Sequence, residues 1–282
     1  MKYLDHLQVL DDDILAEMST NTDLHAQSEL AQYRGAIEAA YEAYRIAGGS
    51  QPPYHPWLPE SLRDAMKSQY GSPCNALKGF IHFTRHRLSP GVCSVCGAAS
   101  SATLDHVYPK SSWPVFSFFS LNLVPACDQC NRKKDDNFFS HVQGARPVHP
   151  YYDTFLKQRV ALAQLVPPYS APVIDVVPDP TVAPHVLTII EWHLENVVRK
   201  TQIRAALTER WHNICRDPGV FYEGLAFGAT MNHAVHAKLG SLDAVFQTPN
   251  NWESMLQAGI ARDQDAQAFL AACYAAPKEN PL

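Results

Sequence analysis

CSVCGAASSATLDHVYPKSSWPVFSFFSLNLVPACDQCNRKKDD, residues 93–136, places two C-x-x-C pairs around a single Asp-His dipeptide. A C-x-x-C turn delivers two thiolates that can share one metal ion, and zinc in a structural site takes four such ligands in a tetrahedron. The two pairs therefore predict a closed zinc site with the ligands Cys93, Cys96, Cys127 and Cys130. Redox or disulfide use of the pairs is the alternative. Because 30 residues separate the pairs, more than a compact zinc ribbon contains, a further segment is inserted between them.

The composition indicates a globular protein. The chain has 282 residues, 46% of them hydrophobic, which is enough for one large domain or about two to three small ones. Near the N-terminus Asp11, Asp12 and Asp13 interrupt the apolar residues, so neither a signal peptide nor a transmembrane span fits. Since metal-binding thiols are typical of a reducing compartment, we expect a cytoplasmic protein without a membrane partner.

Changes in composition divide the sequence into three expected domains. Residues 1–85 form a helical N-terminal region with a linker at 50–59, which carries four prolines in ten residues. Residues 86–146 hold the cysteine pairs, and residues 147–282 form a helical C-terminal domain. The expected fold class is therefore mainly α with a small α+β insert.

Apolar spacings of three and four residues predict the helices of the flanking domains. We expect helical structure at residues 4–47, up to a stop at Gly48-Gly49, and at residues 60–69, 152–165, 184–215, 222–239 and 251–275. The segment 184–215 is expected to be one long amphipathic helix.

The sign of the charge reverses along the chain. The net charge is −5, so bulk charge does not indicate a nucleic-acid partner, and any basic surface must be local. Residues 1–50 carry nine Asp or Glu against three Lys or Arg, a face suited to contact with protein rather than with phosphate. Residues 84–146 carry seven Lys or Arg against four Asp or Glu. The basic excess thus lies in the same segment as the cysteine pairs and the Asp105-His106 dipeptide.

The same segment carries a set of motifs in a distinctive order: Leu104-Asp105-His106, Pro109-Lys110-Ser111, Asn122-Leu123 and Cys127-x-x-Cys130-Asn131-x-x-Lys134. In this order and spacing they resemble the HNH endonucleases of the ββα-metal type, in the subgroup whose core is clamped by four cysteines. The resemblance covers about residues 88–146. It implies a ββα-metal core stapled by a four-cysteine zinc site and flanked by helical N- and C-terminal domains.

The resemblance also assigns roles within this core. His106 would be the general base, and Asn122 would brace the connecting loop and orient that histidine. Asn131, opening the helix, would bind the catalytic metal together with Asp105. The residue types suit these roles, because imidazole titrates near neutral pH and hard oxygen donors favour Mg²⁺ or Mn²⁺. A core histidine without a catalytic role is the alternative for His106.

Basic and aromatic residues of the segment have two interpretations each. Four basic residues can be interpreted either as contacts to backbone phosphates or as solvent-exposed charges without a partner in nucleic acid: Lys110, Arg132, Lys133 and Lys134. We expect four aromatic residues to cover a small hydrophobic core, with stacking on nucleic-acid bases as the alternative: Trp113, Phe116, Phe118 and Phe119. We expect the cysteines outside the pairs to be buried small hydrophobes: Cys74, Cys215 and Cys273.

Together these observations predict a metal-dependent endonuclease that hydrolyses DNA, double-stranded DNA in the first instance. As an extension of the resemblance, we expect an effector of a prokaryotic anti-phage defence system, controlled by a partner such as an ATPase or a sensor subunit. The alternatives are a non-catalytic zinc module that binds nucleic acid or a partner protein, and an HNH nuclease that acts on RNA.

Overall fold

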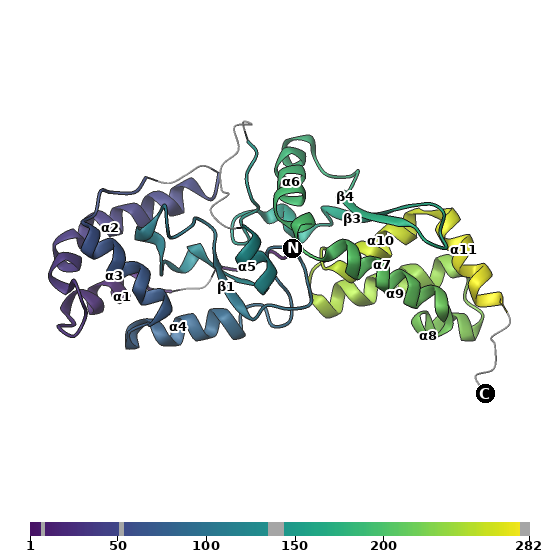
Figure 1. Ribbon diagram of the computed structural model, residues 1–282, viewed down its shortest axis with the longest axis horizontal. Coiled ribbons are helices and arrows are strands. Elements are labelled where there is room, and N and C mark those ends of the chain that lie inside the picture. Colours follow the sequence, from purple (N-terminus) through teal and green to yellow (C-terminus); the bar gives the residue numbers. More distant parts are fainter. Residues whose placement is uncertain (7–8, 51–53, 135–143, 277–282) are drawn as a thin grey trace. The chain divides into compact units, whose positions relative to one another are not determined.

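Helices make up most of the protein in a computed structural model that describes residues 1–6, 9–50, 54–134 and 144–276 (Figure 1). Within these residues the strands are short and pair two by two in separate antiparallel hairpins. The mainly α class expected from the sequence is therefore confirmed.

Contacts divide the chain into two units. The N-terminal unit holds residues 3–95 and 99–154, and the C-terminal unit holds residues 1–2, 96–98 and 155–282. The expected domains 1–85 and 86–146 thus fall, for the most part, into one unit.

The helices of the N-terminal unit are α1 (Asp11–Thr20), α2 (Gln27–Ala47), α3 (Glu60–Gly71), α4 (Asn75–His86) and α5 (Asp128–Lys134). The helix-like segment 4–47 is thus two helices. The predicted stop is correct: Gly48 takes the left-handed conformation, with φ of 53°, and donates its N–H to the carbonyl of Tyr44 at 3.2 Å. Glycine adopts this conformation without the steric cost that a Cβ would bring, so α2 ends there.

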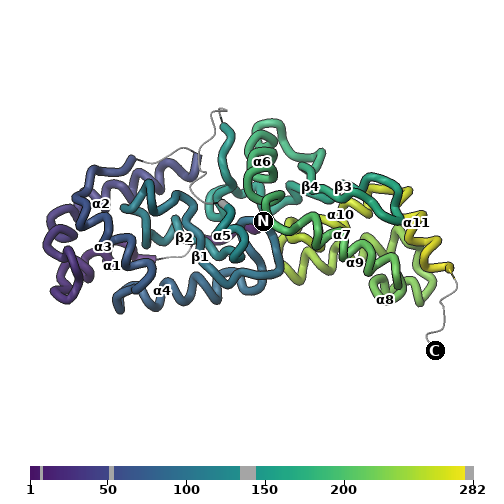
Figure 2. The backbone as a smooth tube through the Cα atoms, in the orientation of Figure 1, coloured from purple at the N-terminus to yellow at the C-terminus, as the bar shows by residue number. Residues whose placement is uncertain are grey.

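A short hairpin lies between α4 and α5. Its strands β1 (Thr103–His106) and β2 (Leu123–Ala126) are antiparallel, and Asp105 pairs with Val124 while His106 pairs with Leu123. The connection contains two 3-10 turns, η1 (Pro114–Phe116) and η2 (Ser120–Asn122). Helix α4 contacts both strands and α5 contacts β1 (Figure 2). The order along the chain is therefore strand, strand, helix.

Aromatic side chains join α2 to the connection between β1 and β2. The rings of Tyr41 and Phe119 stack with centroids 4.2 Å apart, and the ring of Tyr44 meets that of Phe116 edge-on at 5.0 Å. The four aromatics of uncertain role are all buried: Trp113, Phe116, Phe118 and Phe119. Their prediction as core cover is confirmed, and burial of this apolar area fixes α2 against the hairpin.

The C-terminal unit consists of a hairpin and a set of helices. Its elements are η3 (Thr154–Lys157), β3 (Ala161–Val166), β4 (Val173–Pro178), α6 (Pro184–Asn196), η4 (Val198–Lys200), α7 (Ile203–Arg216), α8 (Pro218–Phe221), η5 (Glu223–Phe227), α9 (Met231–Phe246), α10 (Trp252–Arg262) and α11 (Gln264–Ala275). The helix predicted for residues 222–239 begins only at Met231. The one predicted for residues 251–275 divides at Asp263, whose carboxylate accepts the N–H of Ala266 and so starts a new helix.

The helix predicted over residues 152–165 is wrong. The chain forms η3 and then β3, which pairs with β4 from Ala161 opposite Pro178 to Val166 opposite Val173. The apolar run of β3 fits a buried strand as well as a helix, and the partner strand decides between them.

The predicted long helix over residues 184–215 is also wrong, because it breaks between α6 and α7. Val197 leaves the helical conformation with φ of −126° and ψ of −63°, and Thr201 is extended. The Thr201 hydroxyl donates to the carbonyl of Val198 at 2.6 Å and satisfies a group that the helix would otherwise use. Neither glycine nor proline marks this break in the sequence.

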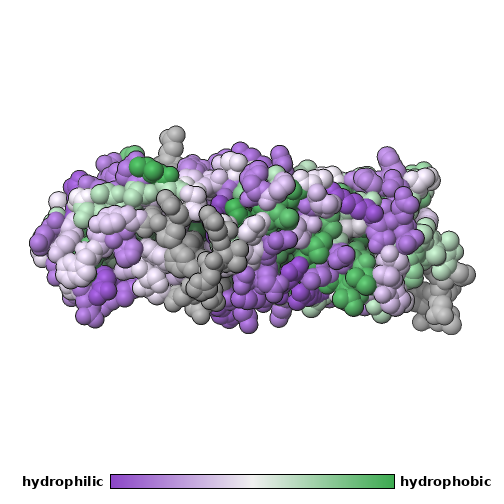
Figure 3. Space-filling view, turned by 90° about the horizontal axis from the view of Figure 1, so that it is seen from above, coloured by the Kyte–Doolittle hydropathy of each residue, from purple (hydrophilic) through white to green (hydrophobic). Residues whose placement is uncertain are grey.

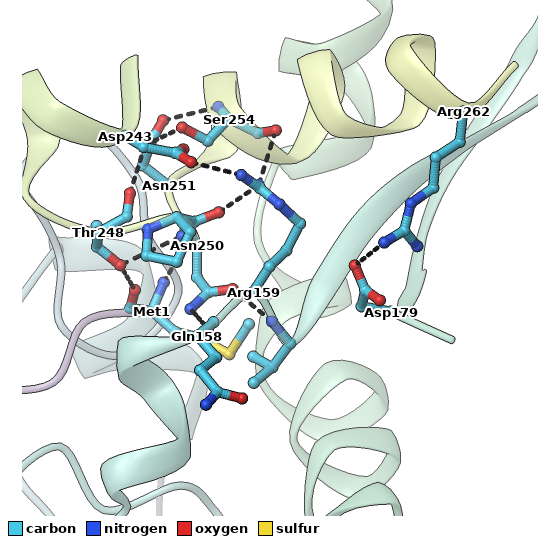
Figure 4. Close-up of polar contacts among 12 residues, drawn as sticks. Met1, Gln158, Arg159, Asp179, Asp243, Thr248, Asn250, Asn251, Ser254 and Arg262 are labelled. Carbon is cyan, nitrogen blue, oxygen red and sulfur yellow. Dashed lines mark hydrogen bonds and ion pairs between the residues drawn. The ribbon is translucent and has the colours of Figure 1, made fainter. Parts of the chain in front are cut away.

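Polar side chains, the buried Asn250 among them, tie the loop before α10 to the start of β3 (Figure 4). The amide of Asn250 accepts the N–H of Val160 at 2.8 Å and donates to the carbonyl of Gln158 at 2.7 Å. The guanidinium of Arg159 donates to Asp243 at 2.6 Å and to the carbonyl of Pro249 at 2.6 Å. These contacts hold the hairpin of the C-terminal unit against α9 and α10.

Figure 3 shows a face that is largely hydrophilic, with apolar side chains gathered in separate patches. Among the described residues, no helix combines the length and the apolar character needed to cross a membrane.

The contact of α10 with β3 predicts opposite effects for two glycines. A Cβ on Gly259 would overlap the carbonyl oxygen of Ala163, whereas one on Gly240, in α9, would meet nothing within 4 Å. Gly259→Ala is expected to lower the free energy of unfolding by about 1–3 kcal/mol. Gly240→Ala is expected to raise it by about 0.5–1 kcal/mol, because alanine favours the helix. Urea denaturation measures both, and equal effects would contradict this packing.

The buried carboxyl of Asp11 predicts a pH-dependent stability. Burial raises the pKa of Asp11 to about 6, although its oxygens accept the N–H of Ser120 at 3.0 Å and the Ser120 hydroxyl at 2.7 Å. The folded protein then binds this proton more tightly than the unfolded chain, so stability falls as the pH rises from about 4 to about 6 and stays level above. Asp11→Asn should therefore gain stability over the wild type across that window, by at most about 3 kcal/mol.

Thermal unfolding between pH 4 and pH 8 tests this expectation, with Asp13→Asn as the control because Asp13 is exposed in the same helical turn. A constant difference between Asp11→Asn and the wild type across the range would contradict the assignment.

Candidate functional site

Four cysteine sulfurs converge at the candidate metal site. The Sγ atoms of Cys93, Cys96, Cys127 and Cys130 all lie within 4.8 Å of one another, and the four residues are buried. Sulfurs around a tetrahedral zinc ion are about 3.8 Å apart, given zinc–sulfur bonds of about 2.3 Å. The predicted ligand set is therefore brought together, and its spacing and chemistry fit a zinc ion.

Backbone N–H groups point at two of these sulfurs and stabilise their negatively charged thiolate form. The N–H of Ala98 lies 3.4 Å from the Sγ of Cys96, and the N–H of Cys130 lies 3.5 Å from the Sγ of Cys127. Donors of this kind favour the thiolates that bind metal. By contrast, the cysteines expected to be buried outside the cluster are only half-buried: Cys74, Cys215 and Cys273.

The last two residues of β1 are the predicted metal ligand, Asp105, and the predicted general base, His106. Asp105 and His106 are 6% and 7% exposed. The Nε2 atom of His106 lies 2.9 Å from the carbonyl oxygen of Ser117. Because a carbonyl only accepts, Nε2 carries the hydrogen in this contact, and Nδ1 is then the basic nitrogen of the neutral ring.

Asn122 braces the connection between the strands. Its Oδ1 accepts the N–H of Tyr108 at 2.7 Å, and its Nδ2 donates to the carbonyls of Tyr108 and Phe116, each at 3.0 Å. These bonds connect Tyr108 and Phe116, in the loop after β1, to Asn122, which directly precedes β2. The geometry agrees with the bracing expected of this residue, since the loop also contains Ser117, the partner of His106.

Two residues outside the recognised motifs complete this network. The hydroxyl of Tyr44, in α2, donates to Oδ1 of Asn122 at 3.1 Å and lies 2.9 Å from Nε2 of His149. Asp153 accepts two bonds from Arg146, at 2.7 and 2.6 Å, and the N–H of His149 at 2.6 Å. We expected neither Tyr44 nor His149 here, because both lie outside the motifs between the cysteine pairs.

The second predicted metal ligand lies on α5. Asn131 is exposed and is the fourth residue of that helix, so it does not open the helix as expected. Its N–H donates to the carbonyl of Cys127 at 3.1 Å, which fixes the first turn of α5 to the cysteine cluster. Because α5 contacts β1, the helix that carries Asn131 packs against the strand that carries Asp105.

The predicted phosphate contacts differ in their surroundings. Arg132 and Lys133 are exposed on α5, and the Arg132 guanidinium forms an ion pair with Asp128 one turn earlier. Lys134 belongs to α5, but its side chain lies outside the described residues. Lys110 is half-buried, with its ammonium 4.5 Å from the centroid of the Tyr70 ring.

Tyr70, near the end of α3, is a further residue that the motifs do not contain. Its ring centroid lies 4.4 Å from that of His106, and its hydroxyl donates to the carbonyl of Leu104 at 2.7 Å. Burial raises the pKa of the Tyr70 phenol; Arg85 opposes the rise and the charge of Asp105 adds to it. Tyr70 therefore lies within electrostatic range of both the Asp105 carboxylate and Arg85 of α4.

Comparisons with known proteins give a local similarity. The chain is 31% identical over 77 residues to the protein ea31 of Escherichia phage lambda, a match that covers 26% of this chain and 26% of that protein. The chain thus aligns with about a quarter of the length of that relative. No known protein family matches the chain, and no solved structure matches it.

The cysteine cluster predicts one zinc ion per chain. Cys130→Ala is expected to lose the metal and to lower the melting temperature strongly, because a site with three thiolates holds zinc weakly and α5 is anchored by that cluster. Mass spectrometry of the metals in protein purified without added zinc measures the content. Cys215→Ala is the matched control, since that cysteine lies outside the cluster. Full zinc content in Cys130→Ala would contradict the site.

Proposed function

We propose that the protein is an HNH-type endonuclease that hydrolyses phosphodiester bonds of DNA. The observation that carries this proposal is the arrangement around His106, which directly follows Asp105 in β1. The Nε2 atom of its ring lies 2.9 Å from the carbonyl oxygen of Ser117, which fixes the orientation of the imidazole. The order β1, β2, α5 and the four clustered thiols agree with the motif resemblance. A module that only binds zinc requires the cysteines but not this arrangement.

His106 is proposed as the general base. With the hydrogen on Nε2 directed to Ser117, Nδ1 takes a proton from water as the water oxygen forms its bond to phosphorus. The bond from phosphorus to the leaving oxygen breaks in the same displacement. Asn122 fixes the loop that contains Ser117, so it keeps the imidazole in the tautomer and orientation that the step needs.

Asp105 and Asn131 are proposed to hold the catalytic metal. They offer one carboxylate and one amide oxygen from β1 and α5, a donor set that fits Mg²⁺ or Mn²⁺ with water and phosphate oxygens as the remaining ligands. A divalent ion bound there would stabilise the negative charge that develops on the phosphate and the leaving oxygen. Zinc would remain in the closed cysteine site, where it has a structural role.

DNA is proposed as the substrate because cations lie on the elements around His106. Lys110 follows β1, Arg85 lies on α4, and Arg132 and Lys133 are exposed on α5. Lysine and arginine bind backbone phosphates without reading base sequence. The local basic excess thus offers a binding surface in a protein whose net charge is −5.

We further propose that the protein is an effector in anti-phage defence that a partner, such as an ATPase, restrains. Among the large apolar side chains that the N-terminal unit exposes are Leu10 at 68% and Ile46 at 78%, both within the acidic residues 1–50, and Trp57 at 75% just after them. Such side chains are candidates for contact with protein. A pure chain that cuts DNA at full rate and co-purifies with no partner would contradict this regulation.

The mechanism predicts that His106→Ala abolishes cleavage of supercoiled plasmid in the presence of Mg²⁺ or Mn²⁺. Loss of the base is expected to slow hydrolysis by about 10²–10⁴-fold. Zinc content should stay that of the wild type, since the imidazole ligates no zinc, and the variant should still unfold cooperatively, with a melting temperature lowered by the loss of a buried hydrogen bond. Gel electrophoresis of the plasmid measures the rate.

His233→Ala is the control, because His233 is exposed on α9 in the C-terminal unit. Cleavage that persists in His106→Ala, or that needs no added divalent metal, would contradict the mechanism. An intact zinc-bound wild type that cuts neither DNA nor RNA would favour the binding module instead.

A further inference from the structure

The ring of Tyr70 connects α3 with the candidate base. Its hydroxyl is anchored to the backbone of β1 at Leu104, two residues before His106, and its ring meets the imidazole at 63° with centroids 4.4 Å apart. One end of the tyrosine is thus fixed to the strand while the ring limits the positions that the imidazole can take. Ser117 restrains the same imidazole through Nε2.

The same ring carries a cation. The ammonium of Lys110 lies 4.5 Å from the centroid of Tyr70, within the range of a cation–π contact. This contact lowers the freedom of a flexible side chain while its N–H groups remain able to bind an anion. Base and cation are therefore held by one side chain.

The cations Lys110, Lys67 and Arg85 act on the groups around this ring, together with the Asp105 carboxylate. Asp64 pairs with Lys67 at 2.7 Å. Burial lowers the pKa of Lys110, and the charge of Lys67, on α3, lowers it further. Arg85 of α4 acts on the Tyr70 hydroxyl. Lys67 and Lys110 repel each other, and a phosphate bound at Lys110 would relieve that repulsion.

We propose that Tyr70 is a positioning residue of the phosphodiester site: it orients the imidazole of His106 and holds Lys110 against a backbone phosphate of the nucleic acid. This inference rests on the proposed function. It extends the site beyond the segment that resembles HNH nucleases, because α3 precedes the first cysteine pair. Lys110 then belongs to substrate binding through Tyr70, whereas His106 belongs to the chemical step.

Two substitutions separate the ring from the hydroxyl. Tyr70→Phe keeps the ring over Lys110 and beside His106, and it should retain most of the activity. Tyr70→Leu removes the ring, and it is expected to lower kcat on a short DNA duplex by about tenfold or more through loss of orientation, and to raise KM severalfold. Tyr33→Leu is the control, because Tyr33 is a half-buried tyrosine of α2 that also meets an aromatic ring, Trp57 at 6.4 Å.

DNA binding tests the role of Lys110 without cleavage. In the His106→Ala background, Lys110→Ala should weaken binding of the duplex, and adding Tyr70→Leu should weaken it little more, since the tyrosine acts through the lysine. Fluorescence anisotropy measures these affinities. Losses that simply add would overturn this part of the proposal.

The histidine NMR signals test the orientation of His106 without any substrate. In the protein with zinc and no other added metal, Tyr70→Leu should move the ring signals of His106, and Tyr70→Phe should leave them near their wild-type positions. His106 is identified by the signals that His106→Ala lacks. If the wild type cuts no nucleic acid, the proposed function fails while this measurement still decides the contact. Unmoved His106 signals, or a Tyr70→Leu kcat equal to that of Tyr33→Leu, would overturn the inference.

Discussion

The convergence of four buried thiols is the constraint on which the candidate site depends. Two of them lie before β1, a third separates β2 from α5, and the fourth lies within α5. A hairpin with strands of four residues each has little stability alone, so an anchor at its ends is what makes its geometry definite. Metal binding at this point would link the folding of the hairpin to the placement of Asp105 and Asn131.

The site is not confined to the segment between the cysteines. Tyr44 from α2 reaches Asn122, Tyr70 from α3 reaches His106, and His149 closes the network from the other side of the motif. The aromatic packing of α2 against the loop excludes water from these hydrogen bonds, which raises the cost of leaving any of them unmade. The helices before the hairpin therefore serve the orientation of the candidate base as well as the core.

Sequence reasoning succeeded where the signal is local. Spacing predicted the cysteine cluster, and the stop at Gly48 followed from the conformation that glycine permits. It failed where a distant partner decides: β3 is a strand because β4 pairs with it, and Tyr70 meets the hairpin through a carbonyl 34 residues further along the chain. No periodicity within a short window reports such contacts. The roles of Asp105, His106, Asn122 and Asn131 remain predictions from the motif.

Anomalous diffraction from crystals grown with Mn²⁺ and a DNA duplex that the protein cannot cleave would test the central claim most directly. Data at the zinc and manganese absorption edges distinguish the two metals. The account predicts zinc among the four cysteine sulfurs, manganese between Asp105 and Asn131, and a phosphate beside Nδ1 of His106. Manganese bound elsewhere, or DNA bound away from His106, would contradict it.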